Sequence, residues 1–181
     1  MLQIAPGTAG IETSVFDCRL RRVCRIFAAM LSKKAKYGIR ALLCLAQRRG
    51  QGPTMIKDIA QAERIPKKFL EAILVDLKSG GILRSRSGRT GGYELLRPPN
   101  EVNLGYVIRL MDGPLAPIPC VSQTAYAPCE DCTDERTCLI RLVMKEVRDA
   151  TARILEQTTL ETMLAQKERF RSAVAALDFH I

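Results

Sequence analysis

Four of the chain's seven cysteines fall within nineteen residues, and this cluster is the clearest sign of chemistry in the sequence. They are Cys120, Cys129, Cys132 and Cys138, with the spacing C-x8-C-x2-C-x5-C. Thiolates ligate zinc and iron–sulfur clusters, and in a reducing compartment clustered cysteines favour metal ligation or redox sensing over disulfides. The spacing therefore predicts a loop that wraps one metal centre.

The spacing is compatible with more than one kind of site: an iron–sulfur cluster, a zinc ion or metal-free thiols. Zinc favours two compact CxxC knuckles, and only Cys129-x2-Cys132 is one, so the looser intervals favour a wider iron–sulfur cluster over a zinc ion. Four metal-free thiols could instead act as a peroxide or thiol sensor. The loop also carries acids that oppose thiolate formation without metal: Glu130, Asp131, Asp134 and Glu135. We expect the other cysteines to be bystanders, with Cys44 in the core: Cys18, Cys24 and Cys44.

The segment before the cysteines predicts a winged helix-turn-helix. Helical spacing of apolar residues predicts a first helix from a Ser32 cap to Arg48 or Arg49, and a second, short helix capped by Thr54. A third helix is predicted after Pro66, over 67–79, with five apolar residues at helical spacing: Phe69, Leu70, Ile73, Leu74 and Leu77. Two short apolar strands, 82–85 and 93–96, then flank a loop rich in Gly and Arg, which is typical of a β-hairpin wing.

The second half of the chain predicts a proline-containing loop between helices. A helix is expected over 104–111 with Asn103 as its cap, and the prolines of 113–138 exclude a continuous helix there. A long helix then begins near Cys138. Its apolar residues are three and four apart and form a coiled-coil-like seam: Ile140, Val143, Val147, Ala150 and Ile154. The seam predicts a homodimer, with packing onto the chain's own core as the alternative. Thr158 and Glu161 form a capping box that starts a last helix.

These elements give a mainly α fold with a small β-hairpin wing and a long dimerisation helix. The expected organisation is a winged helix-turn-helix domain over 30–112, a cysteine-rich loop over 113–138, and the dimerisation helix with the following helix over 139–164. Residues 165–181 are assigned as a tail. Residues 1–29 are expected to be an extension, because Met30 restarts the sequence as a translation start would; a basic DNA-contacting arm is the alternative.

The charge of the chain is distributed unevenly. Residues 31–97 carry fifteen Lys or Arg against five acids, a net +10, whereas residues 98–181 carry a net −3. A basic block next to a mildly acidic one predicts a nucleic-acid-binding half and a half with another task. The sequence contains no run of eighteen apolar residues, so no membrane span is predicted. The first thirty residues also lack a signal-peptide pattern. A cytoplasmic protein is therefore expected.

Six charged residues are candidates for contact with double-stranded DNA. Lys67, Lys68 and Glu71 lie at the start of the third helix, where a recognition helix reads base edges. Arginines on a thin glycine-rich hairpin suit the minor groove or its phosphates, and here they are Arg84, Arg86 and Arg89. The reading of the chain as an enzyme is weak, because the only histidine is His180 and neither a phosphate-binding loop nor a nucleophile motif is present.

Four stretches carry a resemblance to a known family: MLSKKAKYGIRALL, IPKKFLEAIL, GRTGGYELLRPP and LMDGPLAPIPC. From Met30 to about Leu164 the chain resembles the IscR/NsrR/RirA/CymR family (Rrf-type) of bacterial winged-helix transcription regulators. The resemblance implies a homodimer that binds operator DNA. It also implies an iron–sulfur cluster on three loop cysteines, with 2Fe–2S favoured over 4Fe–4S, whose state controls repression or activation.

The chain departs from the family pattern in its ligands and in its wing. Members with a cluster usually add a fourth, non-cysteine ligand, a His or an Asp, and those positions here are Arg141 and Lys36. A site made of all four cysteines would need no such ligand. In the wing, Ser87-Gly88-Arg89 replaces the usual Arg-Gly-Pro, which leaves either Arg86 or Arg89 as the minor-groove arginine.

The expected function is a homodimeric, sequence-specific transcription regulator that senses redox state, iron or nitric oxide through an iron–sulfur cluster. The alternative is a regulator of the same fold without a cluster, controlled by zinc, by thiol chemistry or by a protein partner.

Overall fold

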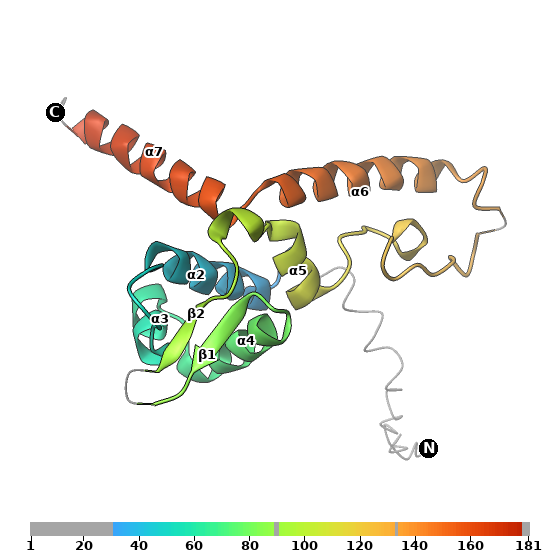
Figure 1. The fold of residues 1–181 in the computed structure, drawn as a ribbon. Coiled ribbons are helices and arrows are strands. Elements are labelled where there is room, and N and C mark those ends of the chain that lie inside the picture. The colour runs from blue at the N-terminus through green and yellow to red at the C-terminus, as the bar shows by residue number, and fades with distance from the viewer. Residues whose placement is uncertain (1–30, 89–90, 133, 179–181) are drawn as a thin grey trace, which may run out of the picture. The chain divides into compact units, whose positions relative to one another are not determined.

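The computed structural model describes residues 31–88, 91–132 and 134–178 of the 181-residue chain. Within this part, helices dominate and the only sheet is a two-stranded hairpin (Figure 1). The expected extension over 1–29 lies outside the described residues, as do Cys18, Cys24, Arg89 and His180. The elements follow in the order α2 (Lys33–Gln47), α3 (Ile56–Glu63), α4 (Lys67–Ser79), β1 (Leu83–Arg86), β2 (Gly92–Leu95), η1 (Pro99–Glu101), α5 (Leu104–Asp112), η2 (Pro119–Val121), α6 (Leu139–Gln157) and α7 (Leu160–Asp178).

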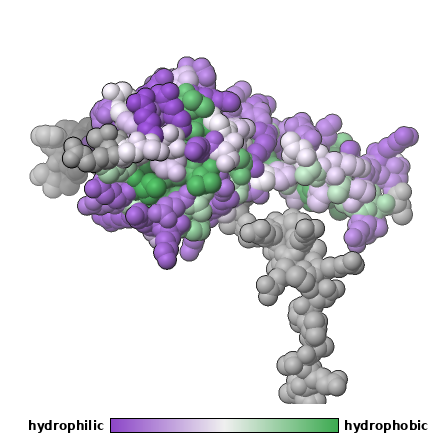
Figure 2. Space-filling model, turned by 60° about the horizontal axis from the view of Figure 1, so that its bottom comes forward, coloured by the Kyte–Doolittle hydropathy of each residue, from purple (hydrophilic) through white to green (hydrophobic). Residues whose placement is uncertain are grey.

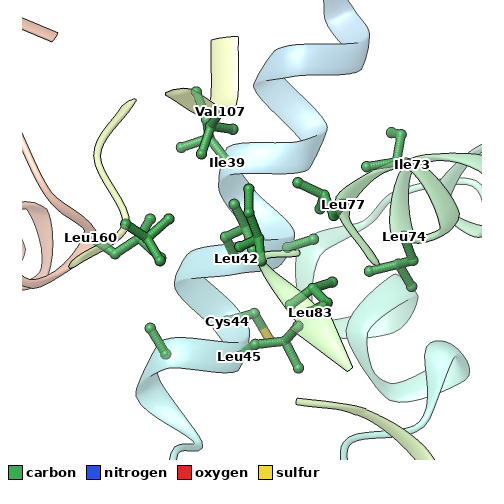
Figure 3. Packing of buried hydrophobic residues seen from close by; sticks show 14 of the residues in the cluster. Ile39, Leu42, Cys44, Leu45, Ile73, Leu74, Leu77, Leu83, Val107 and Leu160 are labelled. Carbon is green, nitrogen blue, oxygen red and sulfur yellow. The ribbon is translucent and has the colours of Figure 1, made fainter. Parts of the chain in front are cut away.

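Helix α2 is the central element of the fold, and it packs against α3, α4, α5, α7 and β2. Ser32 caps it as expected, because the Ser32 hydroxyl accepts a hydrogen bond from the Ala35 N–H at 3.1 Å. Figure 3 shows aliphatic side chains of α2, α4, β1, α5 and α7 converging around Leu42. Cys44 is 4% exposed within this cluster, which confirms its expected place in the core.

The helix-turn-helix consists of α3 and α4 joined by a tight turn. Arg64 adopts a left-handed conformation with φ 50° and ends α3, and Pro66 precedes α4, whose bounds match the predicted 67–79. Four of the five apolar residues predicted for α4 are buried. Phe69 is not: its side chain is 42% exposed and meets the Tyr37 ring edge-on, with the ring centroids 5.8 Å apart.

The wing is an antiparallel hairpin in which Leu83 pairs with Leu95 and Arg84 pairs with Glu94. Its base is held by Thr54, whose N–H and carbonyl both hydrogen-bond to the backbone of Tyr93 at 2.9 Å. A Cβ on Gly92 would lie 2.3 Å from the Thr54 carbonyl oxygen, so only glycine permits this approach. Thr54 is therefore a sheet residue; the cap position of α3 is Met55, and the expected Thr54 cap was wrong.

Helix α5 begins at Leu104 with Asn103 as its cap, as predicted, and the Asn103 side chain accepts from the Tyr106 N–H at 2.8 Å. Between α6 and α7 the expected capping box was wrong in position. Thr158 ends α6, and Thr159 and Thr162 form the cap of α7. The N–H of Thr159 donates to the Thr162 hydroxyl, and the N–H of Thr162 donates to the Thr159 hydroxyl. Helix α7 continues to Asp178, through residues to which the sequence assigned no element.

The surface carries hydrophobic side chains between the polar ones (Figure 2). Many of the large ones belong to α6, whose buried residue is instead an arginine, Arg148. The exposed apolar residues of α6 are Leu139, Ile140, Leu142, Val143, Val147 and Ile154. No helix among the described residues is long and apolar enough to span a membrane.

Candidate nucleic-acid interface and candidate metal centre

The recognition helix presents its expected residues to solvent at its N-terminus. Lys67 and Lys68 are exposed, and Glu71 is half-buried one turn later. The Lys67 ammonium lies 3.9 Å from a Glu71 carboxylate oxygen, and the two side chains are 63% and 47% exposed. A pair this exposed contributes little to stability, so both groups remain able to contact a ligand. The helix itself is positioned by the buried face that Leu70, Ile73, Leu74 and Leu77 press against α2.

In the wing, Arg84 and Arg86 are held together by Glu94, an acid that the sequence analysis did not single out. Both residues lie on β1, two positions apart, so their side chains leave the same face of the hairpin. The Nε of Arg84 and the Nε of Arg86 lie 3.0 and 2.9 Å from one oxygen of Glu94. Glu94 is directly opposite Arg84 in the register, a signal that pairing the two predicted strands could have found. Arg89 lies outside the described residues.

The four loop cysteines differ in exposure and in what positions them. Cys120 lies in η2 and is 3% exposed, whereas Cys129, Cys132 and Cys138 are half-buried. Cys138 is the N-cap of α6, where its sulfur accepts from the Arg141 N–H at 3.5 Å. All four are free thiols rather than disulfides.

Neighbouring thiols raise the pKa values of two of the four cysteines, Cys129 and Cys132. A hydrogen bond with the Cys120 side chain, followed by burial and nearby negative charge, raises the pKa of the Cys129 thiol above its ordinary value. Burial, followed by the charge and hydrogen bond of Cys138, raises the pKa of the Cys132 thiol. Protonated thiols must lose protons to bind metal, so metal uptake by this loop would release protons.

The described residues hold no group of three or more His, Cys, Asp or Glu side chains already placed to bind a metal ion. The donor chemistry nevertheless fits an iron–sulfur cluster, because four soft thiols from one loop and the adjoining helix start make an all-cysteine ligand set. Arg141 and Lys36 stand where the resemblance would have supplied a non-cysteine ligand, and neither side chain can ligate metal as a cation.

A winged helix-turn-helix with a basic recognition helix and a basic wing defines a DNA-binding regulator. The chain belongs to the Rrf2 family, whose description is "Iron-dependent Transcriptional regulator" and whose model matches residues 31–166. This confirms the family resemblance and the fold class drawn from the sequence.

Relatives of the chain are named as transcription regulators rather than enzymes, which confirms the expectation of a non-enzyme. The chain is 45% identical to an rrf2-like HTH-type regulator of Rhodobacter capsulatus, over 75% of this chain and 93% of the relative. It is 32% identical to the HTH-type transcriptional regulator CymR of Bacillus subtilis, over 74% of this chain and 88% of the relative.

Solved structures show the same architecture. The structure of CymR, the global cysteine regulator of B. subtilis, superposes with a TM-score of 0.64 at 31% identity and covers 77% of this chain and 98% of CymR. The structure of T. potens IscR superposes with a TM-score of 0.61 at 27% identity and covers 77% of this chain and 88% of IscR.

Proposed function

We propose that this Rrf2-family regulator is a homodimer whose affinity for operator DNA is set by an iron–sulfur cluster on the cysteine loop. Cys120, Cys129, Cys132 and Cys138 are its ligands in this proposal. The observation that carries it is that one loop and the adjoining start of α6 supply four free thiols, of which Cys120 lies in η2 and Cys138 caps α6. When bound, the cluster supplies a centre that oxidants, iron supply or nitric oxide can alter.

The DNA-binding part of the proposal rests on the exposed cations of α4 and the wing. Lys67 and Lys68 would contact base edges or phosphates, and Glu71 would accept from a cytosine amino group. Arg84 and Arg86, with Arg89 beyond the described residues, would clamp the minor groove or its phosphates. Glu94 fixes the two β1 arginines side by side, which lowers the entropy that each would lose on contact.

A continuous helix connects the cysteine loop to the DNA-binding domain. Helix α6 begins directly after Cys138 and ends at Thr158, whose carbonyl accepts from the Leu104 N–H at 2.9 Å. Val102 likewise accepts from the Leu160 N–H at 3.0 Å. A change in the position of Cys138 would therefore be transmitted along α6 to α5, which packs against the core helix α2.

The homodimer is supported by the orientation of α6. The helix directs Arg148 inward, at 7% exposed, and leaves the predicted apolar seam outward. Ile140, Val143, Val147 and Ile154 are 67%, 51%, 44% and 61% exposed. Such a stripe on a protein surface marks an interaction site, and its three-and-four spacing suits a second α6 better than an irregular partner surface.

The proposal is tested by purifying the protein without oxygen and recording its visible spectrum together with its iron, sulfide and zinc content. A cluster predicts broad iron–sulfur charge-transfer absorption and equimolar iron and sulfide. Replacing any one ligand, for example Cys129→Ala, should abolish both, whereas Cys44→Ala in the core should leave both in place. A colourless protein with about one zinc per chain would reject the cluster in favour of structural zinc.

The thiol pairing favours a second candidate, a regulator controlled by cysteine oxidation. Cys120 raises the pKa of the Cys129 thiol and Cys138 raises that of Cys132, so peroxide could oxidise each of these two pairs to a disulfide with release of water. A metal-free protein that gains two disulfides on mild peroxide treatment, by mass spectrometry of alkylated peptides, would support this candidate over the cluster.

A further inference from the structure

A recess of about 220 Å³ lies beside the cysteine loop, between η2 with the residues after it and the inward side of α6. Three cations of α6 line it: Arg141, Lys145 and Arg148. They are four and three residues apart and so lie along one side of the helix. The opposite wall is formed by Cys120, Val121, Ser122, Gln123 and Tyr126.

The cations of the recess are not all supplied with hydrogen-bond acceptors, as Arg148 shows. The residue is 7% exposed, and its Nε makes no hydrogen bond to any of the described residues. Its Nη2 pairs with Asp149 at 2.8 Å, which satisfies one end of the guanidinium only. A buried N–H without an acceptor costs free energy, and a bound acceptor would recover it.

Arg141 also has a buried N–H without an acceptor. Its Nε is buried and makes no hydrogen bond within the described part of the chain, although Glu135 Oε2 lies 3.4 Å away. The other Glu135 oxygen accepts from the Tyr126 hydroxyl at 2.7 Å. The carboxylates in these ion pairs are therefore Glu135 and Asp149, against three cations, and the recess keeps an excess of positive charge.

We propose that this recess binds a small oxyanion, the carboxylate or phosphate group of a metabolite, beside the thiol of Cys120. The guanidinium of Arg148 would donate through its free Nε–H, and Lys145 would supply a second charged donor. The recess has the volume of about seven water molecules, which suits a small acid and is below the usual range for larger organic ligands. Ser122 and Gln123 offer further polar contacts on the facing wall.

This site goes beyond the proposed function and does not rest on it, because the cations that would hold the anion are not cluster ligands or proposed DNA contacts, although Cys120 lines the same recess. If both exist, however, they are linked: an anion that touches Cys120 and α6 would alter the cysteine loop, and the state of the loop would alter anion affinity equally.

The test is calorimetric titration of the full-length, anaerobically purified protein with two probes at constant ionic strength, inorganic phosphate and succinate. We expect saturable binding of at least one probe with one site per chain, and the tighter probe identifies the oxyanion. Arg148→Met and Lys145→Met should each weaken binding about tenfold, the effect of losing one charge-assisted hydrogen bond. Arg153→Met, an equal charge change at an exposed α6 position outside the recess, should leave the affinity unchanged.

Lys145 is exposed, so its variant keeps the test decisive even if the Arg148 variant fails to fold. The proposal is overturned if neither probe saturates in the millimolar range, if Lys145→Met binds as the wild type does, or if Arg153→Met weakens binding equally, since that would indicate general charge screening.

Discussion

Arg84, Arg86 and Glu94 show how single residues prepare the wing for DNA. Two arginines on one face of a thin hairpin repel each other, and the carboxylate of Glu94 between them offsets that repulsion. The Arg84 and Arg86 side chains are still 52% and 60% exposed, so their outer nitrogens can reach a phosphate. The acid therefore positions the arginines without removing their charge from the surface.

Arg86→Ala tests this role most cleanly, because Arg84 still pairs with Glu94 and the hairpin keeps its cross-strand contact. Loss of one phosphate contact should lower the slope of log affinity against log salt by about 1 and weaken binding to all sequences alike. Fluorescence anisotropy with a labelled duplex over a salt series measures this. Lys78→Ala, at the other end of α4, is the matched control, and a slope unchanged in Arg86→Ala would remove the wing from the interface.

At the residue scale, the sequence predicted where helices begin and end better than it predicted which distant residues contact each other. The bounds of α4 and the Ser32 and Asn103 caps followed from local rules of spacing and capping. The cap expected at Thr54 was wrong, because the backbone of Thr54 pairs with that of Tyr93, which lies far along the chain. Phe69 satisfied the helical pattern but pairs with Tyr37 near the surface. Each miss arises from a tertiary contact that overrides a local preference.

Helix α6 is the element whose exposed residues carry the proposed dimer interface. Two of its charged residues, Arg141 and Arg148, are turned inward, whereas most of its large aliphatic residues are exposed, which is unusual for a surface helix. The sequence predicted the seam from its spacing, yet the inward arginines were not foreseen. A pattern of apolar residues locates a buried face but does not say what the opposite face contacts.

Val147→Asp should disrupt the dimer, because it places a charge in the middle of the seam where pairing would bury it. We expect at least a tenfold rise in the dimer dissociation constant, measured by sedimentation equilibrium or light scattering over a concentration series. Gln61→Asp makes the same charge change at an exposed position of α3 and should have no effect. A Val147→Asp protein that associates as the wild type does would exclude the seam as the interface.

The whole molecule joins two electrostatically different halves. Residues 31–97 carry the net +10 of the DNA-binding half, and residues 98–181 carry a net −3 together with the cysteine loop. Sequence composition was sufficient to separate these halves. It could not show their connection, which depends on the hydrogen bonds that link Val102 and Leu104 to the junction of α6 and α7.

In the proposed function, the state of the cysteine loop sets DNA affinity. This coupling is tested most directly by anisotropy titration of one duplex, selected from a random library by the anaerobic protein, with the cluster-loaded and cluster-free forms at the same salt concentration. We expect dissociation constants that differ by at least about tenfold, a coupling of about 1.4 kcal/mol. We also expect Cys129→Ala to bind as the cluster-free form does. Equal affinities of the two forms would contradict the account.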